Sequence, residues 1–229
     1  MDYKPANRIL SELPEAELAR LMRLLKPVTL SAEQQLSDGP AGRFVYFPET
    51  AVISSISAMQ DGKTAEVGMI GFEGVADVTS LLGKGRNGHS LNVSIAGRAL
   101  KANVDDFARE MSSTNRVQQR LLEYTANYVA QVSQRSACAV LHRLEQRFAI
   151  WLLLLADRLP DKVIQITHER IAERLGVRRA GITVVAANMK AAGIIAYSRG
   201  GLRILDRGKL EELACECYRN LALHSDNNL

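Results

Sequence analysis

The stretch THERIAERLGVRRAGITVVAANMKAAGII, residues 167–195, has the pattern of two short helices separated by a glycine. Thr167 can accept a hydrogen bond from the free amides of a first helical turn. Ile171 and Leu175 are four residues apart and therefore share one helix face. Gly176 can adopt the left-handed backbone conformation that ends a helix in a tight turn. The pattern predicts a helix-turn-helix.

The second helix of this motif is expected to begin at Arg178 or Arg179. Its inner face is predicted to consist of Ile182, Val185 and Met189. The outward positions are then Arg178, Arg179, Ala180, Gly181, Thr183, Val184, Ala187 and Lys190. Arginines at the start of a helix that enters the major groove can reach phosphate oxygens or the O6/N7 edge of guanine. The outward face is therefore a candidate DNA-reading surface, with catalytic residues expected nowhere in the chain.

A basic hairpin is predicted directly after the second helix. Residues 194–197 and 202–205 read as strands, and Arg199 lies in the turn between them. The order of elements is a helix, a glycine turn, a helix that begins with arginines, and a basic hairpin. This order predicts a winged helix-turn-helix that binds double-stranded DNA. A winged-helix adaptor that binds another protein remains the alternative at this point.

The charge distribution supports the DNA-binding interpretation. The chain has a net charge of +4. Residues 170–209 contain nine Lys or Arg residues but only Glu173 and Asp206 as acids. A basic block in an otherwise slightly acidic chain is typical of a phosphate-binding surface.

The rest of the chain changes its pattern near residues 28 and 104. Residues 28–103 contain short alternating stretches separated by Gly and Pro, which is typical of a jelly roll. Residues 104–140 have helical periodicity without a strong breaker. We therefore expect an α+β fold with four parts: a β-roll with N-terminal helices at 1–104, a long helix at 105–140, the winged helix-turn-helix at 141–209 and a tail at 210–229.

An apolar stripe runs along the long helix with spacings close to a 3.5-residue repeat. It consists of Val117, Leu121, Tyr124, Tyr128 and Val132. Such a stripe is typical of a two-helix seam, and it predicts a homodimer paired along this helix. A helix packed on its own domain is the alternative.

Composition argues against several other classes of protein. The longest apolar stretch, residues 149–156, is too short to span a bilayer, so no membrane partner is expected. The N-terminus has no apolar signal region, and the three cysteines do not form a disulfide framework, so a cytoplasmic location is expected. A cupin-like metalloenzyme would need several histidines in the strand region, and only His89 of the four lies there. We therefore expect no enzyme and no metal site.

Over nearly its full length the sequence resembles the Crp/Fnr superfamily of bacterial regulators. The resemblance rests on residues 166–195 (ITHERIAERLGVRRAGITVVAANMKAAGII), 199–207 (RGGLRILDR) and 47–75 (FPETAVISSISAMQDGKTAEVGMIGFEGV). It implies a cyclic-nucleotide-binding-like (cNMP-binding-like) β-roll, a long dimerisation helix and a C-terminal winged helix-turn-helix. It also implies a homodimer that binds a near-palindromic operator, with RNA polymerase as a further partner.

Carried over residue by residue, the resemblance assigns roles within the motif. Thr167 lies where the first motif helix meets a phosphate, and Arg179 matches the arginine that reads guanine in the cyclic-AMP-binding members. Those members have an acidic residue and a second arginine where this chain has Ala180 and Val184. The operator is therefore not expected to be theirs, and contact with thymine methyl groups becomes an option.

The nucleotide pocket of the family is degenerate in this chain. The matching positions are Gly74, Val75, His89 and Ser90, and they lack both the glutamate that holds the ribose and the arginine that holds the phosphate. Without these charge-assisted contacts, cyclic AMP is expected to bind weakly or not at all, and the small-molecule effector is left open. Cys138, Cys215 and Cys217 are scattered in sequence, so no iron–sulfur cluster and no other cofactor is expected, although a redox or metal-binding role for Cys215 and Cys217 stays open.

Overall fold

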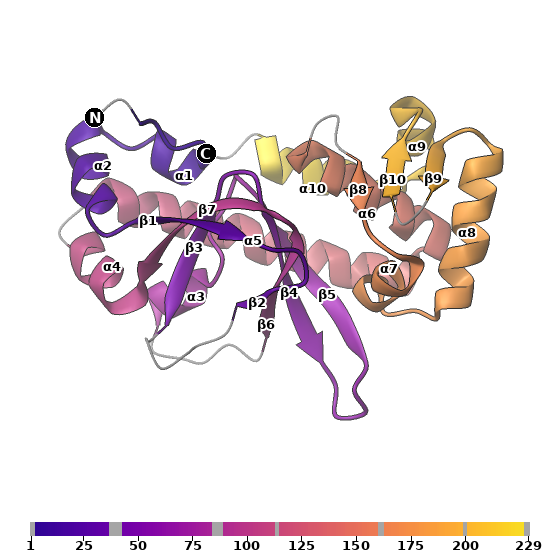
Figure 1. Cartoon of the computed structure of the whole chain (residues 1–229), viewed down its shortest axis with the longest axis horizontal. Helices are drawn as coiled ribbons and strands as arrows, with labels where there is room; N and C mark the ends of the chain where they lie inside the picture. The colour runs from indigo at the N-terminus through magenta and orange to yellow at the C-terminus, as the bar shows by residue number, and fades with distance from the viewer. Residues whose placement is uncertain are drawn as a thin grey trace. The chain divides into compact units, whose positions relative to one another are not determined.

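The computed structural model describes residues 3–36, 43–83, 89–112, 115–159, 163–198 and 201–226 (Figure 1). The chain forms two compact units. Unit 1 comprises residues 1–55, 68–129 and 226–229, and unit 2 comprises residues 56–67 and 130–225. Both sheets and helices are present, as the α+β prediction requires. Among the described residues, every helix is too short or too polar to serve as a membrane-spanning segment.

Two sheets of short strands build the predicted β-roll. The first has the order β1–β7–β3, and the second has the order β2–β6–β4–β5. The strands are β1 (Lys26–Leu30), β2 (Gln35–Leu36), β3 (Phe44–Pro48), β4 (Val52–Ala58), β5 (Thr64–Ile70), β6 (Ser90–Ile95) and β7 (Gly97–Asn103). Val28 pairs with Ala99, and Val45 pairs with Ala102. Gly62, with a φ of 82°, lies in the predicted turn between β4 and β5.

Short helices close the ends of the roll. They are α1 (Arg8–Ser11), α2 (Glu15–Met22), α3 (Val78–Leu82) and α4 (Val104–Met111). The Asn103 side chain caps α4 by accepting hydrogen bonds from the amides of Asp105 and Asp106. Phe107 of α4 is fully buried against Phe47, with ring centroids 5.2 Å apart.

The single helix predicted for residues 104–140 is in fact two helices, α4 and α5 (Asn115–Leu141). Helix α4 ends at Met111, with Ser112 as its C-cap. A serine side chain competes for the hydrogen bonds of the helix backbone. Serine is a weaker helix-breaking signal in a sequence than glycine or proline, so the pattern did not reveal this break.

Two glycines of the roll allow α5 to approach the sheets closely. A Cβ on Gly74 would overlap the ring of Tyr124, and a Cβ on Gly68 would overlap the Tyr128 hydroxyl. Both tyrosines extend from α5 within unit 1. Gly68 and Gly74 therefore serve the packing of α5 against the roll.

Unit 2 contains the C-terminal elements. They are α6 (Leu144–Arg158), β8 (Ile164–Gln165), α7 (His168–Leu175), α8 (Arg179–Ala191), β9 (Ile195–Ser198), β10 (Gly201–Ile204), α9 (Arg207–Leu213) and α10 (Cys217–Asp226). Helix α6 forms the core, with Phe148, Trp151 and Leu152 buried. The strands form a small antiparallel sheet in the order β8–β10–β9.

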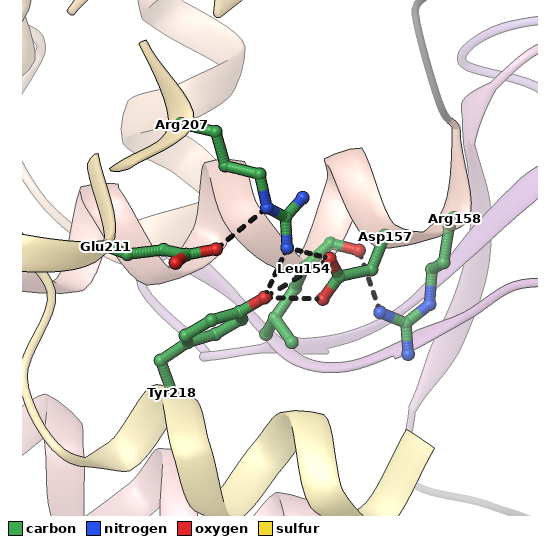
Figure 2. A network of polar contacts seen from close by, with 6 residues as sticks. All are labelled: Leu154, Asp157, Arg158, Arg207, Glu211 and Tyr218. Atoms are coloured by element: carbon green, nitrogen blue, oxygen red, sulfur yellow. Dashed lines mark hydrogen bonds and ion pairs between the residues drawn. The ribbon is translucent and has the colours of Figure 1, made fainter. Parts of the chain in front are cut away.

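A polar network joins α9 and α10 to the end of α6 (Figure 2). The Arg207 guanidinium lies 2.6 Å from Asp157, 2.8 Å from Glu211 and 2.6 Å from the Tyr218 hydroxyl. Tyr218 in turn donates to the Asp157 carboxylate at 3.1 Å. Burial and the Asp157 charge raise the pKa of Tyr218 to about 12, so it is protonated at neutral pH.

Candidate nucleic-acid interface

The first helix of the motif has the predicted boundaries. The exposed Thr167 Oγ1 accepts a hydrogen bond from the Arg170 amide at 3.3 Å, which caps α7. Helix α7 ends at Leu175, and Gly176 follows with a φ of 64°. A residue with a side chain would be strained in that conformation. The local signals read from the sequence therefore place the turn correctly.

The second helix is oriented almost as predicted. Helix α8 begins at Arg179, and Arg178 is its N-cap. The buried positions are Ile182, Ala186 and Met189, whereas Val185 is half-buried. Gly181, which was expected to face outward, lies against helix α6, since a Cβ there would lie 3.0 Å from Leu144 Cδ2. Gly181 differs from the prediction because α6 packs against the start of α8.

The remaining face of α8 is exposed. It consists of Arg179, Ala180, Thr183, Val184, Ala187, Asn188 and Lys190, with the N-cap Arg178 beside it. Arg179 pairs with Glu169 at 3.8 Å, but both side chains are more than half exposed. Such a pair contributes about 0–1 kcal/mol, so the Arg179 side chain can exchange Glu169 for another acceptor at little cost. The helix and its N-cap thus offer three cations, one hydroxyl, one amide and small apolar groups.

A contact that the sequence pattern does not indicate joins both motif helices to the hairpin. His168 Nδ1 lies 3.2 Å from Thr183 Oγ1, and the His168 ring lies 4.5 Å from that of Tyr197. The Tyr197 hydroxyl donates to the Ile166 carbonyl. Burial, followed by the charge of Arg179, lowers the pKa of His168, so the imidazole is neutral at neutral pH. An isolated histidine in a sequence carries no signal of such a role.

The predicted hairpin is present as β9 and β10. Ser198 pairs with Gly201, and Tyr197 pairs with Leu202. Arg199, the predicted basic tip, lies outside the described residues. Arg203 of β10 is exposed.

The basic block of the sequence does not form one continuous surface. Arg174 is buried, and Arg207 belongs to the network at the end of α6. Arg170 and Lys209 form local ion pairs with Glu173 and Asp206. Within the described ranges, the exposed cations without an ion pair in this block are Arg178, Lys190 and Arg203. The charge available to a partner is therefore smaller than the residue count implies, and it lies on α8 and the hairpin.

The stripe predicted to form the dimer seam packs against the protein's own chain. Val117, Leu121 and Tyr124 are buried in the core of unit 1, and Tyr128 packs against the same core. Val132 lines a cavity of unit 2. All five side chains of the stripe contact their own chain, so the alternative of a helix packed on its own domain explains them.

A different face of α5 is exposed and has a heptad pattern. Its residues are Leu122, Ala126, Val129, Ser133, Ser136 and Val140, with alternating spacings of four and three. Leu122 is 54% exposed, Val129 58% and Val140 83%. Only the more apolar stripe was identified from the sequence, and this second face was not among the predictions.

The four residues matched to the family's nucleotide pocket have different surroundings. Gly74 lies against Tyr124, and the Val75 side chain is buried in the core of unit 1. His89 is exposed and Ser90 is half-buried. A cavity of about 340 Å³ in unit 1 is lined by other residues, namely Tyr3, Met22, Pro27, Val28, Thr29, Glu49, Arg98 and Leu100.

The three cysteines, which are scattered in sequence, lie together in unit 2. Cys138, Cys215 and Cys217 have their sulfur atoms close to one another and to His142. The expectation of no metal site at these cysteines rested on their spacing in the sequence, whereas the fold brings them together.

Comparisons with known proteins agree with this architecture. Residues 146–213 match the family described as the Crp-like helix-turn-helix domain. No curated protein sequence matches the chain.

Several solved structures share the fold over most of both chains. A chain from Eubacterium rectale assigned to the Crp/Fnr family of transcriptional regulators is 17% identical, covers 90% of this chain, is itself covered to 97%, and gives a TM-score of 0.69. FixK2 from Bradyrhizobium japonicum is 16% identical, with coverages of 83% and 98% and a TM-score of 0.69. A Crp-family transcriptional regulator from Thermus thermophilus is 19% identical, with coverages of 82% and 96% and a TM-score of 0.65. At these identities the likeness shows a shared fold.

Proposed function

This chain has the fold of the Crp/Fnr transcription regulators and carries their Crp-like helix-turn-helix domain at residues 146–213, and from this premise we propose that it binds an operator as a homodimer. The observation that carries the proposal is the exposed face of α8. This face begins with Arg178 and Arg179, continues with Thr183 and Val184, and is flanked by the hairpin β9–β10.

Helix α8 is proposed to enter the major groove with its N-terminal end. Arg179 would exchange its weak pair with Glu169 for the O6/N7 edge of a guanine, a bidentate contact worth about 1–3 kcal/mol of discrimination. Val184, 60% exposed and one turn further along the helix, suits contact with a thymine methyl group.

The remaining contacts are proposed to go to the phosphate backbone. Thr167 at the start of α7 is exposed, and the first amides of a helix attract anions. Lys190 and the wing would contact phosphates on either side of the groove, and Arg199, which the sequence predicts in the turn of the wing, is a further candidate. These contacts position the protein and make its affinity depend on salt.

Dimerisation is proposed along the exposed heptad face of α5. Leu122, Val129 and Val140 provide apolar contact, while Ala126, Ser133 and Ser136 are small enough for two helices to approach closely. A second copy of this chain is the proposed occupant, because the same heptad spacing on both helices lets the two faces interlock. Two recognition helices would then address two half-sites of a near-palindrome.

Unit 1 is proposed to be the sensing part, with a small molecule other than cyclic AMP as the effector, and RNA polymerase is the proposed protein partner at the promoter.

The DNA-binding role is tested with Arg179→Ala on an operator obtained by selection. Affinity for the operator should fall by about 1–3 kcal/mol, with specificity relaxed at one base-pair position and little change on random DNA.

The matched control is Arg109→Ala, because Arg109 is an exposed arginine of α4 in an ion pair with Asp106. This variant should bind both DNAs like the unmodified chain. An equal loss on operator and random DNA for Arg179→Ala would contradict base reading by α8. A protein-binding adaptor would show no salt-dependent affinity for either DNA.

A further inference from the structure

Three thiols and one imidazole meet in unit 2, outside the DNA-binding face. Cys138 lies in the last turn of α5, and His142 follows the end of that helix. Cys215 lies between α9 and α10, and Cys217 is the first residue of α10. One ligand atom from each of the four side chains lies within 4.8 Å of all the others.

Local backbone geometry aims each pair of ligands in a common direction. The His142 amide donates to the Cys138 carbonyl at 3.1 Å, so the helical turn extends to His142 and places both side chains on one face. Cys215 and Cys217 are buried, whereas Glu216 between them is exposed. The two thiols therefore point inward together, and the carboxylate points outward.

Two of the distances between ligand atoms match a tetrahedral zinc site, and all of them lie within 4.8 Å. Cys138 Sγ lies 3.7 Å from Cys215 Sγ, and Cys217 Sγ lies 3.5 Å from His142 Nδ1. With zinc bonds of about 2.3 Å to sulfur and about 2.0–2.1 Å to nitrogen, tetrahedral angles put two sulfurs about 3.8 Å apart and a sulfur and a nitrogen about 3.6 Å apart. The Sγ–Sγ distance is far too long for a disulfide, and all three cysteines are free thiols.

Outer partners hold two of the four ligands in orientation. His142 Nε2, the ring nitrogen turned away from the thiols, lies 3.3 Å from the Glu216 carboxylate. A carboxylate on the far nitrogen of a histidine fixes its tautomer and leaves the other nitrogen available to a metal. The Gln134 side chain donates to Cys217 Sγ at 3.0 Å, as expected for a partner of a thiolate.

The segment that carries Cys215 and Cys217 is anchored on both sides by other contacts. Arg207 of α9 and Tyr218 of α10 both bind Asp157 of α6 (Figure 2). The ligands are therefore positioned by the fold of unit 2 and need no large rearrangement to bind a metal.

We propose that Cys138, His142, Cys215 and Cys217 bind one zinc ion. Four protein ligands close the coordination sphere, which is typical of a structural zinc site and leaves no position for a substrate. Binding converts three thiols to thiolates and releases three protons to solvent, while His142 binds through its neutral Nδ1. The ligand atoms converge on one point, which favours a single ion over an iron–sulfur cluster, whose ligands are divided among several irons.

The direct test is the metal content of the full-length chain purified under reducing conditions without chelator. Elemental mass spectrometry should give one zinc ion per chain. After removal of zinc, titration with Co²⁺ should give the visible bands of tetrahedral cobalt and a sulfur-to-cobalt charge-transfer band, both saturating at one equivalent. Zinc far below one per chain, together with no cobalt bands, would overturn the proposal.

Variants identify the ligands. Cys217→Ser and His142→Gln should lower cobalt affinity by more than about 100-fold, because loss of a ligand exceeds the roughly 10–100-fold effect of an outer partner. Glu216→Gln, which changes an outer partner, should lower it by about 10–100-fold. His89→Gln, at the exposed histidine of the roll, is the matched control and should bind cobalt like the unmodified chain.

Three other results would contradict the zinc site. One is iron with inorganic sulfide in place of zinc. Another is a Cys138–Cys215 disulfide in the purified chain, together with no metal uptake after that disulfide has been reduced. The third is unchanged cobalt affinity in folded Cys217→Ser. If Cys217→Ser does not fold, the metal content and cobalt titration of the unmodified chain decide the question.

Discussion

The Arg135 guanidinium lies 2.8 Å from the fully buried Glu66 carboxylate, 69 residues away in sequence. The Trp151 indole donates to the same oxygen at 3.2 Å. Glu66 belongs to β5, Arg135 to α5 and Trp151 to α6, and all three residues are part of unit 2. One buried carboxylate thus joins β5 to α5 and α6 within unit 2.

Arg135→Met should destabilise the protein by about 3–5 kcal/mol, because it leaves the Glu66 charge buried without its partner. The free energy of unfolding in urea measures the effect. The double variant Arg135→Met with Glu66→Gln should recover more than half of the loss, since no buried charge remains. The surface control Arg109→Met should cost less than about 1 kcal/mol. A similarly small cost for Arg135→Met would refute a structural role for the pair.

Arg207→Met should destabilise unit 2 by about 1–2 kcal/mol, because three contacts are lost but the side chain is 47% exposed and partly screened by water. Urea unfolding again measures the change. A double-mutant cycle with Tyr218→Phe should give a coupling energy above about 0.5 kcal/mol, since both side chains bind Asp157. Additive effects of the two substitutions would show that the network does not act as a unit.

The stability of the protein should fall in mild acid because of His168. Its pKa is lowered in the folded chain, so below about pH 6.5 the unfolded chain binds a proton that the folded chain does not yet accept. Stability is therefore full above that pH and declines as the pH falls toward the folded pKa. Urea unfolding at a series of pH values tests this. His168→Gln should show a flatter dependence between about pH 5 and about pH 7, and an unchanged slope would contradict the assignment.

Val129→Asp should convert the dimer to a monomer, because it places a charge in the centre of the proposed seam on α5. Sedimentation or light scattering gives the mass in solution. Leu82→Asp, at an exposed apolar residue of α3, is the control and should leave the mass unchanged. A dimer that persists in Val129→Asp would place the interface elsewhere.

Helix α5 also shows what a sequence pattern cannot predict. Periodicity identifies the faces of α5 but not which face meets the protein's own core. Val117, Leu121 and Tyr124 form the more apolar stripe and are buried by the roll, whereas the weaker stripe with Leu122 and Val129 is exposed. Burial by a distant part of the chain cannot be read from the spacing within one helix.

The motif helices, by contrast, follow from local chemistry. The Thr167 cap and the positive φ of Gly176 depend only on neighbouring residues, so their sequence signals are reliable. The proposed zinc ligands are the opposite case. Cys138 and Cys215 are 77 residues apart, and their juxtaposition depends on how α9 and α10 fold back in unit 2. No short stretch of the sequence contains all four ligands, so no local motif predicts this site.

The most direct test of the account is selection of genomic DNA fragments by the purified chain at low ionic strength. We expect enrichment of a near-palindrome with half-sites about 10–10.5 base pairs apart, and an affinity that falls steeply with added salt. Failure to retain any fragment, with or without cell extract to supply an effector, would contradict the claim that α8 reads DNA.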